Sequence, residues 1–303
     1  MGISSAVSKT GADGCLTAAV SRTPEKLRED IRRLRQGVEH FTVNITIGMC
    51  PRIDEMLKVC IEEKVSSIET AAYSPDEYAE RIKKAGITWV HKAASVRHLV
   101  HAEKIGADAV VLVGRDGRGF KNIRQLPTFT SIAWASRQLK VPLVAAGGIG
   151  DARTFLAALA AGAEGVYMGT AFLITKECPM SDRIKENIIK AEPDHPDLIR
   201  EALAPSNPKE YEEIMSLRGK MPFEKWVPAL ERVMYKHEEW RDVKPMWEQT
   251  VDDLPSPGSR PKGPYSFACA YLDRIVSCQE LIDGIVKGAE EILKGWVKQF
   301  KLA

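Results

Sequence analysis

Short apolar runs alternate with amphipathic segments through about the first 175 residues of the chain. Runs of β-branched residues predict strands, and apolar positions at helical spacing between them predict helices. Strands that alternate with helices across short connections are typical of a parallel sheet with crossover helices. The pattern predicts seven strands, at residues 14–19, 41–47, 66–70, 88–92, 109–113, 143–146 and 165–168.

The helices expected between these strands carry recognisable start and stop signals. The segment 24–36 follows Ser21 and Thr23, and a second helix is expected at 51–63. The segments 76–85 and 95–105 each end at a glycine, where helices commonly stop. We therefore expect an α/β fold, a (β/α)8 TIM barrel with seven of its eight strands visible.

The strand that should come first is missing or atypical, because residues 2–9 already resemble the first crossover helix. Three explanations stay open. The chain starts inside the barrel, or another chain supplies the strand, or the sheet stays open there and its edge needs cover.

The pattern changes after residue 180. A charged, helix-rich stretch with Trp226, Trp240 and Trp247 leads into a linker rich in proline and glycine at 254–264, and an amphipathic helix is expected at 272–293. We expect three parts: a barrel at 1–180, a helical lid or insertion with its linker at 181–263, and a closing part at 264–303 whose helix packs back on the barrel. The tryptophans either form a lid or merely cover the barrel.

Composition excludes several classes of protein. The 43 Lys and Arg balance 41 Asp and Glu, giving a net charge of +2 with interspersed signs, so nucleic acid is not an expected partner. The apolar runs fall short of the ~20 residues of a membrane helix, and no signal peptide is visible. The six cysteines form no Cys-x-x-Cys pair, so we expect reduced thiols, no metal and a cytoplasmic protein.

Two glycine-rich turns form the clearest candidate site. Gly147, Gly148 and Gly150 follow the strand at 143–146, and Gly169 with Thr170 follows the strand one βα unit later. Glycine lets the main chain approach an anion and point several N–H groups at it, and a helix that starts near Asp151 would add its positive end. In (β/α)8 barrels the last two such loops commonly bind phosphate. The alternative is a pair of ordinary tight turns.

Four segments of the chain, 89–99, 101–114, 141–151 and 160–172, resemble the nitronate monooxygenase family, formerly called 2-nitropropane dioxygenases. The family also includes flavin-dependent enoyl-carrier-protein reductases. The resemblance covers about residues 5–180 and implies a barrel with FMN at the carboxyl ends of its strands. The phosphate would then lie on the five residues of the glycine turns, and the flavin on Asn44, Lys92 and Glu69. Each of these three also has an ordinary role open to it, in strand-end hydrogen bonding or at the surface.

The loop after residue 113 departs from the family pattern. Where the family has Gly-x-Glu-x-Gly-Gly-His-x-Gly, this chain has Gly114-Arg-Asp-Gly-Arg-Gly-Phe-Lys-Asn122, so the catalytic histidine is replaced by Phe120. General acid–base catalysis contributes roughly 100-fold to 10,000-fold in rate. Lys92, Tyr73 and Arg118 are the candidates for this role. The cations Arg115, Arg118 and Lys121 either bind an anionic or CoA-type substrate or belong to a solvated loop.

Other polar and aromatic residues have simpler interpretations. His91 is expected to pack in its strand, while His98 and His101 share a helix face without obvious further metal ligands, so no metal site is expected. Tyr73 and Tyr167 could each donate a hydrogen bond at the rim of the flavin, and core packing is the favoured role for Tyr167.

The resemblance favours an FMN-dependent oxidoreductase that acts on a small nitronate or related carbon acid. One alternative is a flavin-dependent enoyl-thioester reductase. The other is an FMN-binding protein or complex subunit with a degenerate active site. The expected partners are a small-molecule or CoA-type substrate, no membrane, and either a second copy or a partner subunit that completes the barrel.

Overall fold

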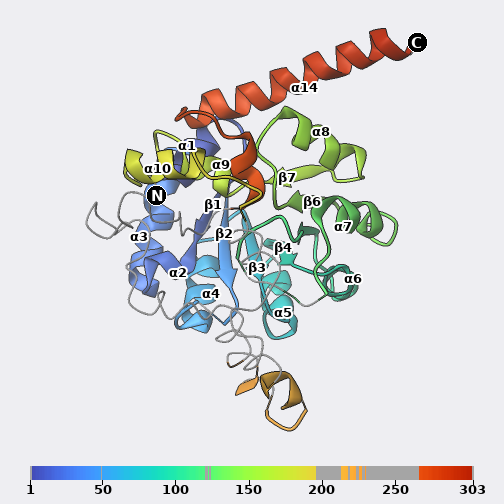
Figure 1. Cartoon of the computed structure of the whole chain (residues 1–303). Coiled ribbons are helices and arrows are strands. Elements are labelled where there is room, and N and C mark those ends of the chain that lie inside the picture. Colours follow the sequence, from blue (N-terminus) through green and yellow to red (C-terminus); the bar gives the residue numbers. More distant parts are fainter. Residues whose placement is uncertain are drawn as a thin grey trace.

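The computed structural model describes residues 2–48, 50–119, 122, 124–195, 213–217, 219–222, 225–226, 229 and 266–301. Within them, seven parallel strands form one curled sheet in sequence order (Figure 1). All seven predicted strands are present, with no boundary displaced by more than two residues. The strands are β1 (Gly14–Thr17), β2 (Phe41–Thr46), β3 (Ser67–Ala71), β4 (Thr88–Ala93), β5 (Ala109–Val113), β6 (Leu143–Ala146) and β7 (Gly165–Tyr167).

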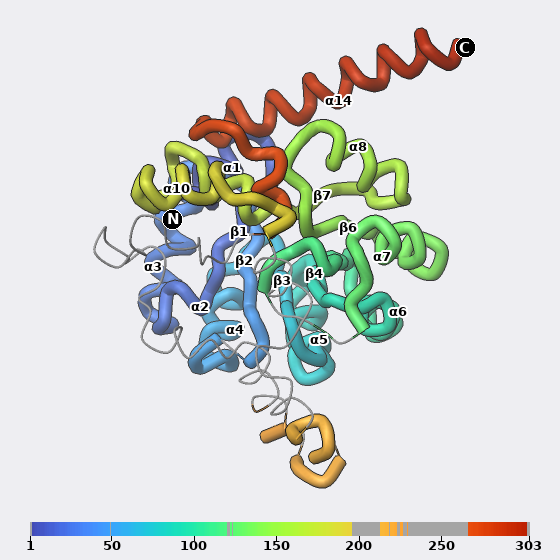
Figure 2. Tube along the Cα trace, viewed as in Figure 1, coloured from blue at the N-terminus to red at the C-terminus, as the bar shows by residue number. Residues whose placement is uncertain are grey.

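Helices surround the outer face of this sheet, which is the (β/α)8 barrel architecture that the sequence predicts (Figure 2). They are α1 (Gly2–Lys9), α2 (Ala18–Ser21), α3 (Pro24–Arg35), α4 (Ile53–Glu62), α5 (Asp76–Lys84), α6 (Val96–Lys104), α7 (Thr128–Ala135) and α8 (Ala152–Ala160). Then come α9 (Thr170–Leu173), α10 (Asp182–Ile189), the 3-10 helix η4 (Phe267–Tyr271) and α14 (Cys278–Phe300). None of the helices described is long and apolar enough to cross a membrane.

The main hydrophobic core lies between the sheet and the helices. Successive strand residues point to opposite faces, and the apolar member of each pair belongs to this outer layer, as with Val43 and Ile45 of β2 or Trp89 of β4. Their neighbours Thr42, Asn44 and Lys92 therefore face the inside of the curled sheet. The strands β1 to β4 thus place polar side chains on the inner face of the sheet, where a binding or catalytic site could use them.

The edge strand β1 is covered by α1. Ser4 Oγ donates a hydrogen bond to the carbonyl of Cys15 at 2.7 Å, and Ser8 Oγ accepts one from the amide of Gly14 at 3.1 Å. A Cβ atom on Gly14 would lie 2.0 Å from the carbonyl oxygen of Ser4, so only glycine permits this approach. Serine side chains here satisfy edge groups that a neighbouring strand would otherwise pair, so the edge has the cover that an open sheet needs.

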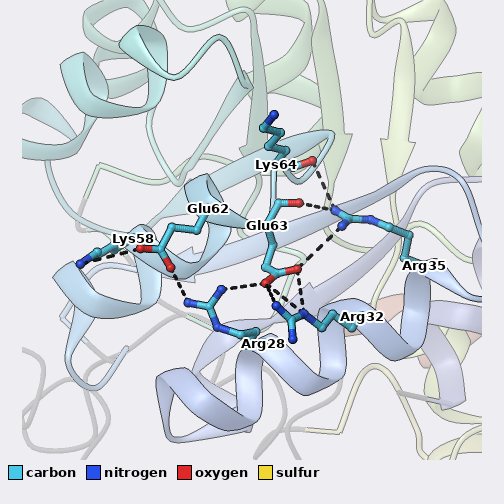
Figure 3. A network of polar contacts seen from close by, with 7 residues as sticks. All are labelled: Arg28, Arg32, Arg35, Lys58, Glu62, Glu63 and Lys64. Carbon is cyan, nitrogen blue, oxygen red and sulfur yellow. Dashed lines mark hydrogen bonds and ion pairs between the residues drawn. The ribbon is translucent and has the colours of Figure 1, made fainter.

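Three arginines of α3 contact Glu63, the residue that follows α4, and so connect the two helices (Figure 3). Arg28 Nη1 and Arg32 Nη2 lie 2.7 and 2.8 Å from Glu63 Oε1, and Arg35 donates to the carbonyl of Glu63. Glu63 is 9% exposed. The hydrogen bonds from Arg32 and Arg28 hold the pKa of its carboxyl below the usual value, although burial opposes them.

The predicted closing helix is present as α14, which begins at Cys278 and extends to Phe300. Its start is set by a capping box, in which Ser277 and Glu280 bond each other's backbone amides. Most of the predicted lid or insertion at 181–263, with Trp240 and Trp247, lies outside the described residues. Trp226 is buried, and its Nε1 donates to the carbonyl of Ile214 at 2.7 Å.

Candidate active site

Three of the predicted ligand residues lie side by side on the inner face of the sheet. Asn44 and Glu69 are direct partners in the register of β2 and β3, and Asn44 Nδ2 donates to Glu69 Oε1 at 2.5 Å. Lys92 Nζ, on β4, lies 2.7 Å from the same oxygen. Asn44 and Glu69 are 3% and 1% exposed. The structure thus assembles a buried amide, a buried carboxylate and a half-buried ammonium in one chain of contacts.

The Lys92–Glu69 ion pair compensates two charges that burial would otherwise penalise. The Lys92 side chain keeps 20% of its surface exposed, against 2% for Glu69, so the ammonium is the member of the pair that solvent or a ligand reaches. An ammonium group has three N–H donors. Among the described residues, Glu69 and Tyr167 accept two of them, which leaves one N–H for a bound molecule.

Tyr167, for which the sequence favours core packing over a hydrogen bond at the flavin rim, contacts Lys92 inside the curled sheet. It ends β7, and its hydroxyl lies 3.2 Å from Lys92 Nζ, which also lies 4.2 Å from the centre of the phenol ring. Burial, and then the charge of Glu69, raises the pKa of Tyr167 well above its usual value. The phenol therefore stays protonated at neutral pH and acts as a hydrogen-bonding neighbour of Lys92 rather than as a base.

The same tyrosine connects the two edges of the described sheet. Its hydroxyl and the thiol of Cys15, on β1, each affect the pKa of the other. Burial, reinforced by Glu69, raises the pKa of Cys15 to about 12, so this thiol is not a reactive thiolate. The first and last strands thus meet through side chains inside the curled sheet.

The glycine turn after β6 has the backbone that its sequence predicts. Gly147 and Gly148 have φ angles of +104° and +71°, in the region that favours glycine. A Cβ on Gly147 would lie 2.7 Å from the amide nitrogen of Gly117, and one on Gly148 would lie 2.8 Å from Cβ of Asp116. Close packing on the loop after β5 therefore adds a second reason for glycine at both positions.

The turn after β7 is more open. No atom of the described residues lies within 4 Å of the position that a Cβ of Gly169 would take. Among the residues that the structure describes, no hydrogen bond engages the amides of Gly148 or Gly169. Each turn thus offers an uncommitted amide donor, and the turn after β7 also offers open space, an arrangement that suits an anion.

The start of α8 has commitments of its own. Asp151 and Thr154 form a capping box, in which Asp151 Oδ1 accepts from the amide of Thr154 at 2.8 Å. The hydroxyl of Thr154 accepts from the amide of Gly150 at 3.2 Å. The amides of Gly150, Asp151 and Thr154 are therefore already hydrogen-bonded within this turn, so they are not among the free amides that the start of α8 was expected to offer a phosphate.

A distant segment covers both turns. The amide of Ser266 donates to Thr170 Oγ1 at 2.9 Å, and the amide of Phe267 donates to the carbonyl of Asp116 at 3.1 Å. Asp116 Oδ2 also accepts from the first amide of α7, that of Thr128, at 2.8 Å. The Thr170 hydroxyl accepts from Ser266 and still has its own proton to donate. No local signal in the sequence could have placed residues 266–271 here, since 96 residues separate Ser266 from Thr170.

Tyr73 and Arg118, the other predicted catalytic residues, lie in the loops after β3 and β5. The ring of Tyr73 packs on Gly48, where a Cβ would lie 2.5 Å from Tyr73 Cε2. Arg118 is half-buried in the loop after β5. Phe120 and Lys121 lie outside the described residues, so the replacement of the family histidine remains an observation on the sequence.

His91 faces away from Lys92, as strand alternation requires. It is 1% exposed, and its Nδ1 lies 2.9 Å from Thr70 Oγ1, which also accepts from Trp89 Nε1 at 2.8 Å. Burial, with smaller effects from His98 and His101, lowers the pKa of His91 to about 4. His91 therefore packs as a neutral core residue. The described residues contain no group of three or more His, Cys, Asp and Glu side chains placed to hold a metal ion.

A family model described as nitronate monooxygenase matches residues 35–288. A probable nitronate monooxygenase of Staphylococcus aureus is 38% identical over 120 residues, which are 37% of this chain and 34% of that protein. A (3aS,4S,5R,7aS)-5-hydroxy-7a-methyl-1-oxo-octahydro-1H-indene-4-carboxyl-CoA dehydrogenase of Rhodococcus jostii is 33% identical over 180 residues, which are 57% of this chain and 49% of that protein. The matches thus span about a third to a half of these relatives.

Solved structures match nearly the whole chain. FabK from Thermotoga maritima superimposes with a TM-score of 0.74 and 27% identity, covering 98% of this chain and 91% of that one. A nitroalkane oxidase from Streptomyces ansochromogenes gives a TM-score of 0.68 at 18% identity, covering 97% and 93%, which shows likeness of fold alone.

Proposed function

Because the chain belongs to the nitronate monooxygenase family, we propose that it is a flavin-dependent oxidoreductase and that its flavin is FMN. The observation that carries this proposal is the buried array of Asn44, Glu69 and Lys92, together with the two glycine turns at the ends of β6 and β7. Bound FMN would take electrons from the substrate and pass them to an acceptor, while the protein supplies binding, orientation and electrostatics.

The phosphate of FMN fits the two glycine turns. Gly148 and Gly169 offer amide donors, Gly147 lets the first turn fold tightly, and Thr170 has a hydroxyl proton to donate. Any side chain at Gly169 would occupy space that is open. Gly150 contributes by shaping the turn, because its amide already bonds Thr154.

The isoalloxazine ring is assigned to the polar inner face. Lys92 offers a fixed positive charge and a remaining N–H donor, which stabilise negative charge that develops nearby. Glu69 holds the ammonium in place, and Asn44 and Tyr167 fix this pair from either side. Lys92 is thus the proposed catalytic residue, with Glu69 and Tyr167 as its positioning residues.

The proposed substrate is a small nitronate. A nitronate is already an anion, so its oxidation requires no base from the protein, whereas a neutral nitroalkane must first lose a proton. Tyr167 is held protonated and Phe120 cannot accept a proton, so neither serves as that base. Tyr73 and Arg118 are proposed to line the substrate side, with Arg118 attracting the anion.

Purification of the full chain tests these proposals in steps. We expect a yellow protein that releases FMN on denaturation, identified by its mass. It should oxidise propionate-3-nitronate in air faster than 3-nitropropionate, whose nitro-bearing carbon still holds its proton. A colourless protein that takes up no added FMN would overturn the cofactor assignment. A yellow protein without turnover would instead support an FMN-binding protein with a degenerate site, and activity gained by Phe120→His would strengthen that conclusion.

A flavin-dependent enoyl-thioester reductase is the second candidate. The full-length likeness to FabK and the match to a carboxyl-CoA dehydrogenase favour it, as do two cations, Arg115 and Arg118, in one loop. Oxidation of NADH or NADPH that depends on an enoyl-CoA, without turnover of propionate-3-nitronate, would select this reading.

A further inference from the structure

The apolar face of α14 continues beyond the part of the helix that packs on the barrel. In the first half, Cys278, Ile285 and Ala289 are buried, and the helix contacts α1 and α8. A Cβ on Gly288 would lie 2.8 Å from Cβ of Ala152, so the two helices approach closely there. Figure 1 shows the remainder of α14, in red, extending past α8 and away from the barrel.

The part of α14 that extends past the barrel carries an apolar stripe that the described residues leave exposed. Its four large side chains recur at spacings of three, four and seven residues, which return to one side of a helix. They are largely exposed: Leu293 46%, Trp296 43%, Val297 51% and Phe300 60%. A contiguous exposed stripe of this kind marks an interaction surface rather than a scatter of single apolar residues.

The charged residues beside this stripe change sign along the helix, from acidic to basic. Glu290 and Lys294 lie four residues apart along one edge of it, with their charged groups 4.0 Å apart. Lys301, which caps the end of the helix in a left-handed conformation, follows eleven residues after Glu290, a spacing that returns near the same side. The acidic residue comes first and the basic ones follow. When two such helices pair antiparallel about a twofold axis, like edges face each other in opposite directions. Glu290 of each then lies opposite Lys301 of the other, so the edge complements itself.

We propose that the stripe Leu293, Trp296, Val297 and Phe300 is the contact surface for a second copy of this chain, with the two α14 helices antiparallel. A twofold contact uses the same surface on both copies and closes after two. The apolar stripe supplies the attraction, and the Glu290–Lys301 edge sets the direction. This proposed contact does not depend on the flavin chemistry, because the stripe lies on the part of α14 that extends beyond the barrel.

Sedimentation of the full chain over a range of concentrations tests the apolar part. We expect a dimer that dissociates on dilution, and a monomer for Leu293→Glu/Val297→Glu with an unchanged circular dichroism spectrum. Val20→Glu is the matched control, because Val20 is 43% exposed on α2 and far from this helix in sequence. A wild-type monomer at every concentration, or a dimer that survives the double substitution, would overturn the proposal. Association that continues beyond two copies would do so as well.

Charge reversal tests the direction. Glu290→Lys and Lys301→Glu should each weaken the dimer about tenfold, because each places like charges together twice in a symmetric pair. The double variant Glu290→Lys/Lys301→Glu should regain the wild-type dissociation constant. Glu291→Lys is the control, since this neighbour lies off the edge and should leave the constant unchanged. Failure of the double variant to recover would exclude the antiparallel arrangement.

Discussion

The ammonium nitrogen of Lys92 lies 2.7 Å from Oε1 of Glu69, the oxygen that also accepts from Asn44. Because Glu69 is almost fully buried, its negative charge is compensated by these two neighbours rather than by water. Asn44, Glu69 and Lys92 together link β2, β3 and β4 on the inner face of the sheet. They therefore couple the stability of the fold to the candidate site.

Replacing Glu69 by Gln should destabilise the protein by about 2–3 kcal/mol, because the half-buried ammonium of Lys92 loses its counter-charge. Lys92→Met should cost a similar amount. The double variant should cost less than the sum of the two, since it leaves no uncompensated charge. Urea unfolding of all four proteins measures the coupling. Strict additivity would show that the pair contributes nothing.

Tyr167→Phe should separate positioning from folding. The phenyl ring keeps the packing, so we expect a loss of stability of about 1 kcal/mol or less, from one hydrogen bond. If the hydroxyl positions Lys92, turnover should fall about tenfold at unchanged FMN content, and mainly in kcat. The matched control is Tyr271→Phe, a tyrosine that is 45% exposed. Unchanged kcat with Tyr167→Phe would remove this residue from the proposed machinery.

Gly169→Val should reduce retained FMN without unfolding the protein. Its φ of −109° suits any residue, and a Cβ there meets nothing within 4 Å. The side chain would instead fill the space assigned to the phosphate. FMN content by absorbance, and melting of the flavin-free protein, check the two halves. Gly284→Ala, on the exposed side of α14, serves as control. Full FMN content in Gly169→Val would place the phosphate elsewhere.

Stability should fall in mild acid because of His91. Its pKa is about 4 in the folded protein, against an ordinary value of 6.5, so the unfolded chain binds the proton more readily between these values. The free energy of unfolding should therefore decrease as the pH falls from about 6.5 to about 4, by about 3 kcal/mol in total. His91→Asn should flatten this dependence, and His40→Asn, at an exposed histidine, should not. Equal slopes in both variants would contradict the assignment.

Glu63 should stabilise the folded protein at neutral pH, and this stabilisation should be lost in stronger acid. Its pKa is lowered in the folded state by Arg32 and Arg28, so its stabilisation is complete above the unfolded value and is lost as the pH falls through the folded one. Glu63→Gln should cost about 1 kcal/mol at neutral pH, since the arginines are partly solvated. Glu186→Gln, which removes a single exposed pairing with Lys190 on α10, should cost less. Urea unfolding at neutral and acidic pH compares the two.

Local order was readable from the sequence because its causes are local. The β-branched runs and the helical spacing between them predict all seven described strands, and glycines with positive φ are expected where Gly147 and Gly148 turn after β6. Strand alternation places Asn44, Glu69 and Lys92 on the face of the sheet opposite the apolar residues that pack under the helices. The family resemblance then assigns these residues to a flavin.

Which side chains meet across the barrel depends on the tertiary structure. Lys92 and Tyr167 are 75 residues apart, and only the curl of the sheet brings β4 and β7 within 3.2 Å. Ser266 reaches Thr170 in the same way, and α1 covers the edge of β1 through two serines. Periodicity states which face a residue occupies, because that follows from backbone geometry. It does not state what lies opposite, because that depends on how far the sheet closes and on which distant segment packs against it.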